Sequence, residues 1–172
     1  MKRRIILYIA TSSDGFIAGK DGSIKFLDKY NESGEDYGYK EFFSSIQSII
    51  FGNNTYQQVG NTKEFKEWYK NTPIFVFSKK LKGKKDNVTF VNEDVKEFAE
   101  KLEGDVWMMG GASILDAFLK EDLIDEFIIT IMPDKLGEGI PLFKEKDFEK
   151  QLKLIDTKKY SLGAIQKHYT RP

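Results

Sequence analysis

The stretch DVWMMGGASILDAFLKED, Asp105–Asp122, passes from a buried strand into a helix through two adjacent glycines. Val106–Met109 is apolar throughout, which is typical of a strand covered on both faces. Gly110 and Gly111 follow directly. Apolar residues then recur at helical spacing, at Ile114, Leu115, Phe118 and Leu119. The sequence therefore predicts a strand–glycine–helix junction.

A glycine pair at such a junction suits the binding of a phosphate group. Glycine adopts backbone angles closed to other residues and lets a ligand approach the main chain. The first N–H groups of the next helix are unpaired and lie at its positive end, where phosphate or pyrophosphate fits. A tight turn that binds nothing is the alternative. The pattern is neither the Rossmann G-x-G-x-x-G motif nor a Walker A loop.

Strand and helix patterns alternate along most of the chain. Apolar and β-branched runs predict strands at Ile5–Thr11, Ser48–Phe51, Ile74–Phe77, Val88–Val91, Val106–Met109 and Glu126–Met132, and Gln151–Lys159 and Gly163–Tyr169 look like an antiparallel pair. Helical spacing appears in YGYKEFFSSI, NTYQQVG, EDVKEFAEKLEG and ASILDAFLKED. This order predicts an α/β layered fold with a mostly parallel sheet and a C-terminal antiparallel hairpin.

A second junction of the same kind follows the strand SIIF, where Gly52 precedes NNTY. In open α/β sheets, ligands bind outside the carboxyl ends of the strands. The two junctions therefore predict one binding edge.

Composition narrows the function. The 172 residues fit one domain, 1–172, and the 27 basic and 27 acidic side chains give no global reason to expect nucleic acid or a membrane surface as partner. The lysine-rich tract Lys79–Lys85 is typical of a solvated loop. Without cysteine and with His168 alone, the chain offers no multi-histidine or cysteine metal site. No apolar run is long enough to span a bilayer, so we expect a cytoplasmic protein without a bound metal.

The ordered motifs resemble a known family. Five segments closely resemble the dihydrofolate reductase superfamily when taken in order along the chain. They are most similar to the reductase domain of the bifunctional riboflavin-biosynthesis deaminase–reductase and its stand-alone bacterial relatives. The segments are SSDGFIAGKDGSIKFL, IIFGNNTYQQVG, PIFVFSKK, VWMMGGASILDAFL and DLIDEFIITIMPDKLGEGIPLF. The resemblance covers nearly the whole chain. It implies a three-layer fold with a central, mostly parallel eight-stranded sheet, helices on both faces and NADP(H) along the strand ends.

The resemblance also implies which residues bind the cofactor. Ala10 and Ile17 match the positions that hold and pack on the nicotinamide. Gly110 and Gly111 match a pair joined by a cis peptide in relatives. The remaining positions match the pyrophosphate and 2′-phosphate contacts, and they are Gly52, Asn53, Thr55, Ser78, Lys79, Lys80, Ala112, Ser113, Ile114 and Leu115. Asn53 stands where relatives carry an arginine, and Lys79 or Lys80 could replace that charge.

Hydride transfer to a C=N carbon is helped by a nearby acid. Among relatives that reduce dihydrofolate, the acid begins the helix after the first loop, and Asp36 is the closest match, ahead of Glu41. Asp36 could instead cap the helix that begins near Tyr37. The aromatic residues Phe26, Tyr37, Phe42 and Tyr56 could wall a flat heterocycle, although aromatic residues at helical spacing are more often core.

The expected function is an NADPH-dependent reductase of a small heterocyclic, carbonyl or imine substrate, resembling 5-amino-6-(5-phosphoribosylamino)uracil reductase. The alternatives are a non-catalytic nucleotide-binding protein that keeps the cofactor cleft and a flavodoxin-like electron carrier. Dihydrofolate is not favoured, because the only arginines are Arg3, Arg4 and Arg171. The resemblance further implies a homodimer.

Overall fold

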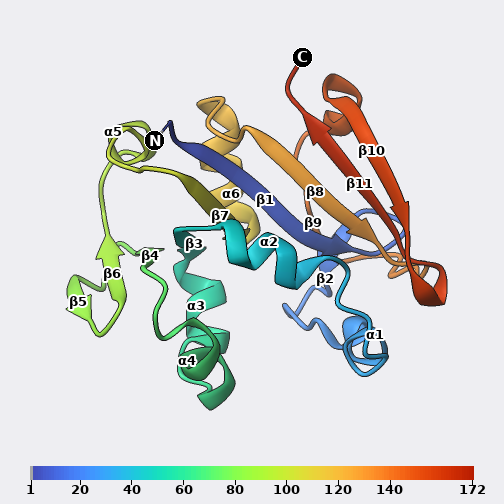
Figure 1. Cartoon of the computed structure of the whole chain (residues 1–172), viewed down its shortest axis with the longest axis horizontal. Helices are drawn as coiled ribbons and strands as arrows, with labels where there is room; N and C mark the ends of the chain where they lie inside the picture. The colour runs from blue at the N-terminus through green and yellow to red at the C-terminus, as the bar shows by residue number, and fades with distance from the viewer. Residues whose placement is uncertain (1) are drawn as a thin grey trace. The chain divides into compact units, whose positions relative to one another are not determined.

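A computed structural model describes residues 2–172 (Figure 1). The chain folds into two compact units, each built from two separate stretches of sequence. Unit 1 comprises Met1–Ile6 and Ser45–Ile124, and unit 2 comprises Leu7–Ser44 and Asp125–Pro172. Strand β1 (Arg4–Thr11) contributes residues to both units.

Unit 1 holds the parallel strands. Their order is β1-β7-β3-β4-β6-β5, with β7 at Asp105–Gly110, β3 at Ser48–Gly52, β4 at Ile74–Phe77, β6 at Val88–Val91 and β5 at Gly83–Lys85. Strand β3 pairs in parallel with both β4 and β7, and β4 pairs in parallel with β6. Only β5 runs antiparallel to its neighbour β6.

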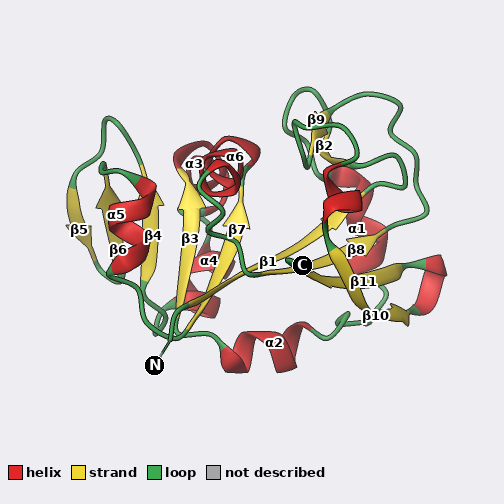
Figure 2. Cartoon of the chain, turned by 90° about the horizontal axis from the view of Figure 1, so that it is seen from above, coloured by secondary structure: helices red, strands yellow, loops and turns green. Residues whose placement is uncertain are grey.

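Burial explains why β3 and β7 are central. Ile49, Ile50 and Phe51 are fully buried, as are Val106 and Met108 in β7. Such strands must be covered on both faces, and the helices of unit 1 provide the cover. These helices are α3 (Asn53–Val59), α4 (Lys63–Tyr69), α5 (Val95–Glu100) and α6 (Ala112–Lys120). Figure 2 shows α3 and α6 beside one another at the same ends of β3 and β7.

Unit 2 holds four strands of the large sheet, of which β10 and β11 pair antiparallel, as do β11 and β8. Their order is β10-β11-β8-β1, with β10 at Lys153–Lys159, β11 at Ile165–Thr170 and β8 at Glu126–Ile131. A small second sheet pairs β2 (Phe16–Ala18) with β9 (Ile140–Pro141). The helices are α1 (Asp28–Asn31) and α2 (Tyr39–Ser45), with single 3₁₀ turns at Lys25–Leu27, Phe148–Gln151 and Ser161–Gly163.

The predicted architecture is confirmed. All eight strands expected from the sequence are present, within two residues at each end, and the hairpin of β10 and β11 is antiparallel. Over residues 2–172 the large sheet has nine strands, because residues 83–85 add the edge strand β5. The lysine tract is therefore a loop only in its first part. Every helix within residues 2–172 is too short or too polar to traverse a lipid bilayer.

Candidate functional site

The two glycine junctions of unit 1 lie at one edge of the parallel strands. Phe51 at the end of β3 is in register with Gly110 at the end of β7, and Gly52 is in register with Phe77 at the end of β4. Since the strands are parallel, their carboxyl ends share this edge. The structure thus brings together Gly52, Gly110 and the Ser78 loop, as the sequence predicted.

The packing of α3 against α6 itself requires glycine at positions 52 and 111. A Cβ atom on Gly111 would lie 2.9 Å from Thr55 Oγ1, and a Cβ atom on Gly52 would lie 3.2 Å from Ile114 Cγ2. Gly110 has a φ of 105°, which L side chains rarely adopt, and its peptide bond to Gly111 is cis, as the resemblance implied. The first turns of α3 and α6 therefore touch through bare backbone and one small side chain each.

Helix α6 presents an open amino end at this edge. Gly111 is its N-cap residue and provides no side-chain cap, and the first helical hydrogen bond runs from Leu115 N to Gly111 O over 3.1 Å. The preceding amides of α6 have no partner within the helix and carry its positive potential. Gly111 and Ala112 are partly exposed and Ser113 is exposed, so an anion can reach these amides. The side chains of Ile114 and Leu115 are buried and belong to the core.

The Ser78 loop follows β4 at the same edge. Ser78 is buried, and its Oγ accepts hydrogen bonds from Lys80 N at 3.3 Å and Leu81 N at 3.0 Å. Its hydroxyl thus shapes the loop, while Lys79 and Lys80 are exposed. Asn53, in the first turn of α3, accepts a weak bond of 3.4 Å from Gln57 Nε2. The cationic side chains at this edge therefore come from the Ser78 loop rather than from position 53.

In unit 2, the loop after β1 is tied down by Asp14. Its Oδ1 accepts from Ser12 Oγ at 2.6 Å and from Leu136 N at 3.1 Å, and its Oδ2 accepts from Gly137 N at 2.7 Å. Burial acts to raise the pKa of Asp14, but these hydrogen bonds outweigh it and lower the pKa to about 2. The carboxylate is therefore ionised at neutral pH and fixes the loop that leads into β2.

Two predicted cofactor residues flank this loop. Ala10, near the end of β1, packs against the buried cluster of Tyr30, Met132 and Ala164. Ile17 lies in β2 and is half-buried. The loop between them contains a closed turn, in which Gly15 N donates to Ser12 O over 3.1 Å. Residues 12–15 thus form a β-turn.

Asp36 is occupied as a helix cap. Its Oδ1 accepts from Gly38 N at 3.0 Å and its Oδ2 accepts from Lys40 N at 3.3 Å. Helix α2 begins at Tyr39, two residues later than predicted, because Tyr37 and Gly38 both have positive φ, 52° and 78°. This geometry favours the capping role of Asp36. Glu41 is exposed, as expected.

The four aromatic residues predicted for a substrate pocket have different neighbours. Phe26 and Tyr37 pack against the cluster of Tyr30, Met132 and Ala164. Phe42 stacks on Tyr8 with ring centroids 4.4 Å apart. In unit 1, the ring of Tyr56 makes edge contacts with Phe65 and Phe90. Nothing in these contacts joins the four rings into one wall.

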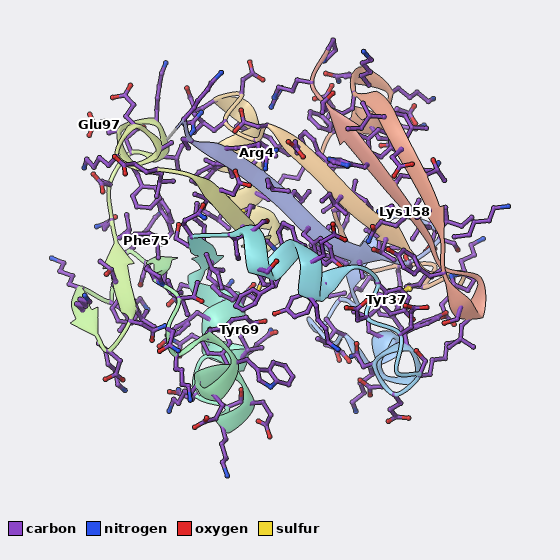
Figure 3. All side chains as sticks on the ribbon, viewed as in Figure 1. Arg4, Tyr37, Tyr69, Phe75, Glu97 and Lys158 are labelled. Carbon is purple, nitrogen blue, oxygen red and sulfur yellow. The ribbon has the colours of Figure 1, made fainter. Side chains whose placement is uncertain are left out.

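The sequence reasoning missed a polar network around Tyr37, the residue labelled in Figure 3. The carbonyl oxygen of Tyr37 accepts from Tyr8 Oη at 2.8 Å and from Gln166 Nε2 at 2.9 Å, and Gln166 also donates to Thr130 Oγ1. Burial raises the pKa of Tyr8, so its phenol stays protonated and donates. The Tyr37 hydroxyl is buried and has no partner within residues 2–172. Polar residues at inward positions of β8 and β11, Thr130 and Gln166, were the available sign of this network.

The parallel strands of unit 1, the glycine junctions at their ends and the antiparallel hairpin of unit 2 define a dihydrofolate-reductase-like domain. The chain belongs to the RibD C-terminal domain family, whose model matches residues 3–165. It is 42% identical to the YwjB protein of Bacillus subtilis (strain 168) over 177 residues, which covers 99% of each chain.

Solved structures agree with this assignment. A putative riboflavin biosynthesis protein from Shewanella sp. PV-4 is 29% identical with a TM-score of 0.85, covering 98% of this chain and 99% of that one. The deaminase/5-amino-6-(5-phosphoribosylamino)uracil reductase of Thermotoga maritima is 16% identical with a TM-score of 0.73, covering 99% of this chain and 57% of that one. Dihydrofolate reductase from Enterococcus faecalis, in complex with NADP(H) and RAB-propyl, is 18% identical with a TM-score of 0.66, covering 98% and 96%. The last two likenesses show the fold alone.

Proposed function

We propose that this protein is an NADPH-dependent reductase that transfers hydride to a small heterocyclic, carbonyl or imine substrate. The observation that carries the proposal is the open amino end of α6 at the same strand edge as two exposed lysines. The family is that of a reductase domain, and one structural neighbour is a reductase solved with NADP(H). The substrate of the riboflavin-type relatives, a phosphoribosylamino pyrimidine, is the first compound to test.

The residues of unit 1 fit a dinucleotide. The free amides at the start of α6 suit a diphosphate, and Gly52 and Gly111 remove the side chains that would cover them. Lys79 and Lys80 lie at the same edge and suit a 2′-phosphate. When bound, the nicotinamide supplies the hydride. Ala10 and Ile17 in unit 2 are the positions that the resemblance assigns to the nicotinamide.

The resemblance assigns proton donation to Asp36. The two carboxylate oxygens of Asp36 already accept backbone amides. This engagement is the observation that favours the second candidate function, a nucleotide-binding protein without catalysis. The two functions differ in one measurable respect, which is whether a bound NADPH is consumed when an imine, carbonyl or pyrimidine substrate is added.

The cofactor proposal is tested by titrating NADPH and NADH against the protein and against Lys79→Ala/Lys80→Ala. Charge-assisted contacts to the 2′-phosphate predict about ten-fold weaker NADPH binding in the variant, with NADH unchanged. Lys96→Ala, an exposed lysine in α5, is the matched control and should bind both cofactors as the parent does. Equal losses for both cofactors would show that the lysines do not read the 2′-phosphate. Failure of the parent to bind either cofactor below about millimolar concentration, a weak affinity of roughly 4 kcal/mol, would overturn the reductase proposal.

A further inference from the structure

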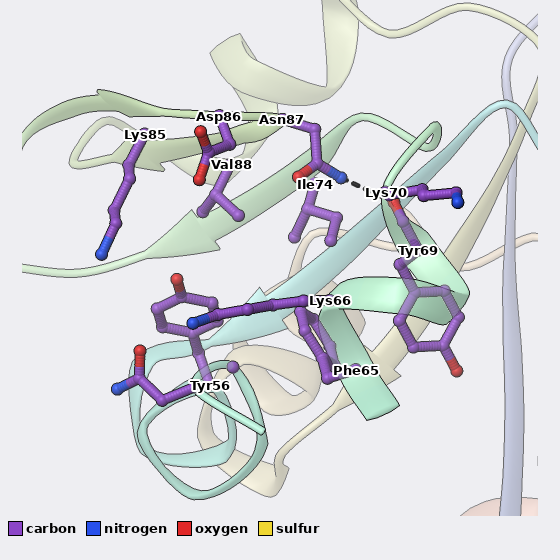
Figure 4. A pocket seen from close by; sticks show the side chains of 12 residues that line it. Tyr56, Phe65, Lys66, Tyr69, Lys70, Ile74, Lys85, Asp86, Asn87 and Val88 are labelled. Carbon is purple, nitrogen blue, oxygen red and sulfur yellow. Dashed lines mark hydrogen bonds between the residues drawn. The ribbon is translucent and has the colours of Figure 1, made fainter. Parts of the chain in front are cut away.

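Unit 1 contains a cavity of about 180 Å³ that is separate from the glycine junctions (Figure 4). It lies between the end of α3, helix α4 and the turn that joins β5 to β6. Ile74 and Val88, which line it, are the paired first residues of β4 and β6. The glycine junctions lie at the opposite, carboxyl ends of the parallel strands. The cavity is therefore independent of the proposed function.

One side of the cavity is aromatic. Tyr56 of α3 and Phe65 and Tyr69 of α4 line it, and each is at most 8% exposed. Their rings meet edge to face, with centroids 6.2 Å apart for Tyr56 and Phe65 and 5.0 Å apart for Phe65 and Tyr69. The three rings support one another and form a fixed apolar wall. A flat ring inside the cavity would contact aromatic edges and faces, the arrangement that aromatic pairs prefer.

The cavity also holds a polar group without a partner. Within residues 2–172 the hydroxyl of Tyr56 makes no hydrogen bond, although the residue is buried and lines the cavity. Burial raises the pKa of Tyr56, and the negative charge of Asp86 raises it further, so the hydroxyl keeps its proton. The oxygen itself is open to the cavity and not sealed in the core, so its donor is available to a ligand.

The charge around the cavity is mainly positive. Lys66, Lys70 and Lys85 line it together with a single carboxylate, Asp86. Lys70 lies 3.6 Å from Glu67, whereas Lys66 and Lys85 make no ion pair in the described part of the chain. Figure 4 shows Lys66 coming from α4 and Lys85 from the end of β5, on two sides of the space. An anion between them would meet two cations that make no ion pair, with Asp86 as the one carboxylate in the lining.

The rim on the strand side is held in place by Asn87. Its Nδ2 donates to Tyr69 O and to Thr72 O, both at 2.6 Å. These bonds tie the β5–β6 turn to the end of α4, which fixes the aromatic wall relative to Lys85, the residue before the turn. Both protons of the Asn87 amide nitrogen are used in these two bonds.

The volume limits the ligand to one ring. A cavity of about 150 Å³ in another protein accommodates benzene, and about 180 Å³ leaves room for one small substituent. We propose that this cavity is a second binding site, which takes a monocyclic aromatic or heteroaromatic carboxylate. The ring lies against Tyr56, Phe65 and Tyr69, and the carboxylate accepts from the Tyr56 hydroxyl and pairs with Lys66 and Lys85.

The test uses benzoate as probe and follows amide chemical shifts of the full-length protein at neutral pH. A ligand of this size predicts a dissociation constant on the order of 1 mM. We expect saturable shifts in α3, α4 and the β5–β6 turn. Benzamide, which has the ring without the charge, should bind several-fold more weakly, and acetate, which has the charge without the ring, should not saturate.

The variant Lys66→Gln/Lys85→Gln should weaken benzoate binding by about five-fold, as expected for two partly solvated ion pairs, and leave benzamide unchanged. Tyr56→Phe should weaken benzoate further while keeping the ring. Lys96→Gln, an exposed lysine on α5, is the matched control. Each spectrum also reports whether the variant is folded. The proposal is wrong if benzoate causes no saturable shifts at tens of millimolar, if the shifts map elsewhere, or if benzamide binds as well as benzoate.

Discussion

The ionised carboxylate of Asp14 stabilises the loop between β1 and β2, and Asp14→Asn measures by how much. The carboxylate accepts three hydrogen bonds, two of them from the amides of Leu136 and Gly137 in the loop after β8. Its pKa falls from 3.8 to about 2. At about 1.4 kcal/mol per pKa unit, this shift corresponds to about 2.5 kcal/mol of folding free energy. Because the side chain is partly exposed to solvent, we expect a contribution of about 2 kcal/mol.

The sign of the pH dependence follows from the lowered pKa. The stabilisation is complete above the ordinary pKa of 3.8 and is lost as the pH falls toward the folded-state value of about 2. At neutral pH we expect Asp14→Asn to lower the free energy of unfolding by about 2 kcal/mol, and near pH 3 the difference should shrink to roughly 1 kcal/mol.

The assay is urea unfolding followed by tryptophan fluorescence, for the parent and the variant, at several pH values. Asp21→Asn is the control, because Asp21 is exposed and accepts a single amide bond of 2.9 Å from Ser23. A loss in Asp14→Asn that stays constant between neutral pH and pH 3, or one that Asp21→Asn reproduces, would refute the reasoning.

Two further predictions concern the helix starts of unit 1. Asp94→Ala removes the side chain that accepts from Lys96 N at 2.9 Å and Glu97 N at 3.2 Å, so it should destabilise the protein by about 1 kcal/mol in urea unfolding; no change would mean that the cap is dispensable. Gly111→Ala places a Cβ atom 2.9 Å from Thr55 Oγ1 and should cost about 1–2 kcal/mol, with a smaller cost when Thr55→Ala is already present. Equal costs in both backgrounds would show that the two residues do not press on one another.

The regular elements were predictable because their patterns are strong. Apolar runs such as Ser48–Gly52 predict buried strands, and the first four residues of this run are buried in the structure. Helix α4 was missed because it is short and charged, although Thr62 accepts from Phe65 N as an N-cap and Phe65 and Tyr69 recur four residues apart. Strand β5 was missed because an exposed lysine strand carries no alternation of apolar residues.

The candidate site was predictable where the backbone decides it. The glycines at 52, 110 and 111 mark close approach and positive φ, and both can be read from a sequence pattern. The hydrogen-bond partners of the side chains could not be predicted from the sequence in the same way. The choice of Asp36 between proton donor and helix cap depends on the positive φ of Tyr37, and that angle depends on Tyr8 and Gln166, which are distant in sequence.

The close contact between the first turns of α3 and α6 also determines which residues could be substituted to change the protein's nucleotide preference. Positions 52, 55, 111 and 114 lie in close contact, and a methyl group added at either glycine would press on Ile114 or Thr55, so a change at one of them disturbs its neighbours. Lys79 and Lys80 reach into solvent and have no such neighbours to satisfy. Engineering of nucleotide preference should therefore leave the four interlocked positions untouched and vary the two lysines, where substitutions carry little cost in folding.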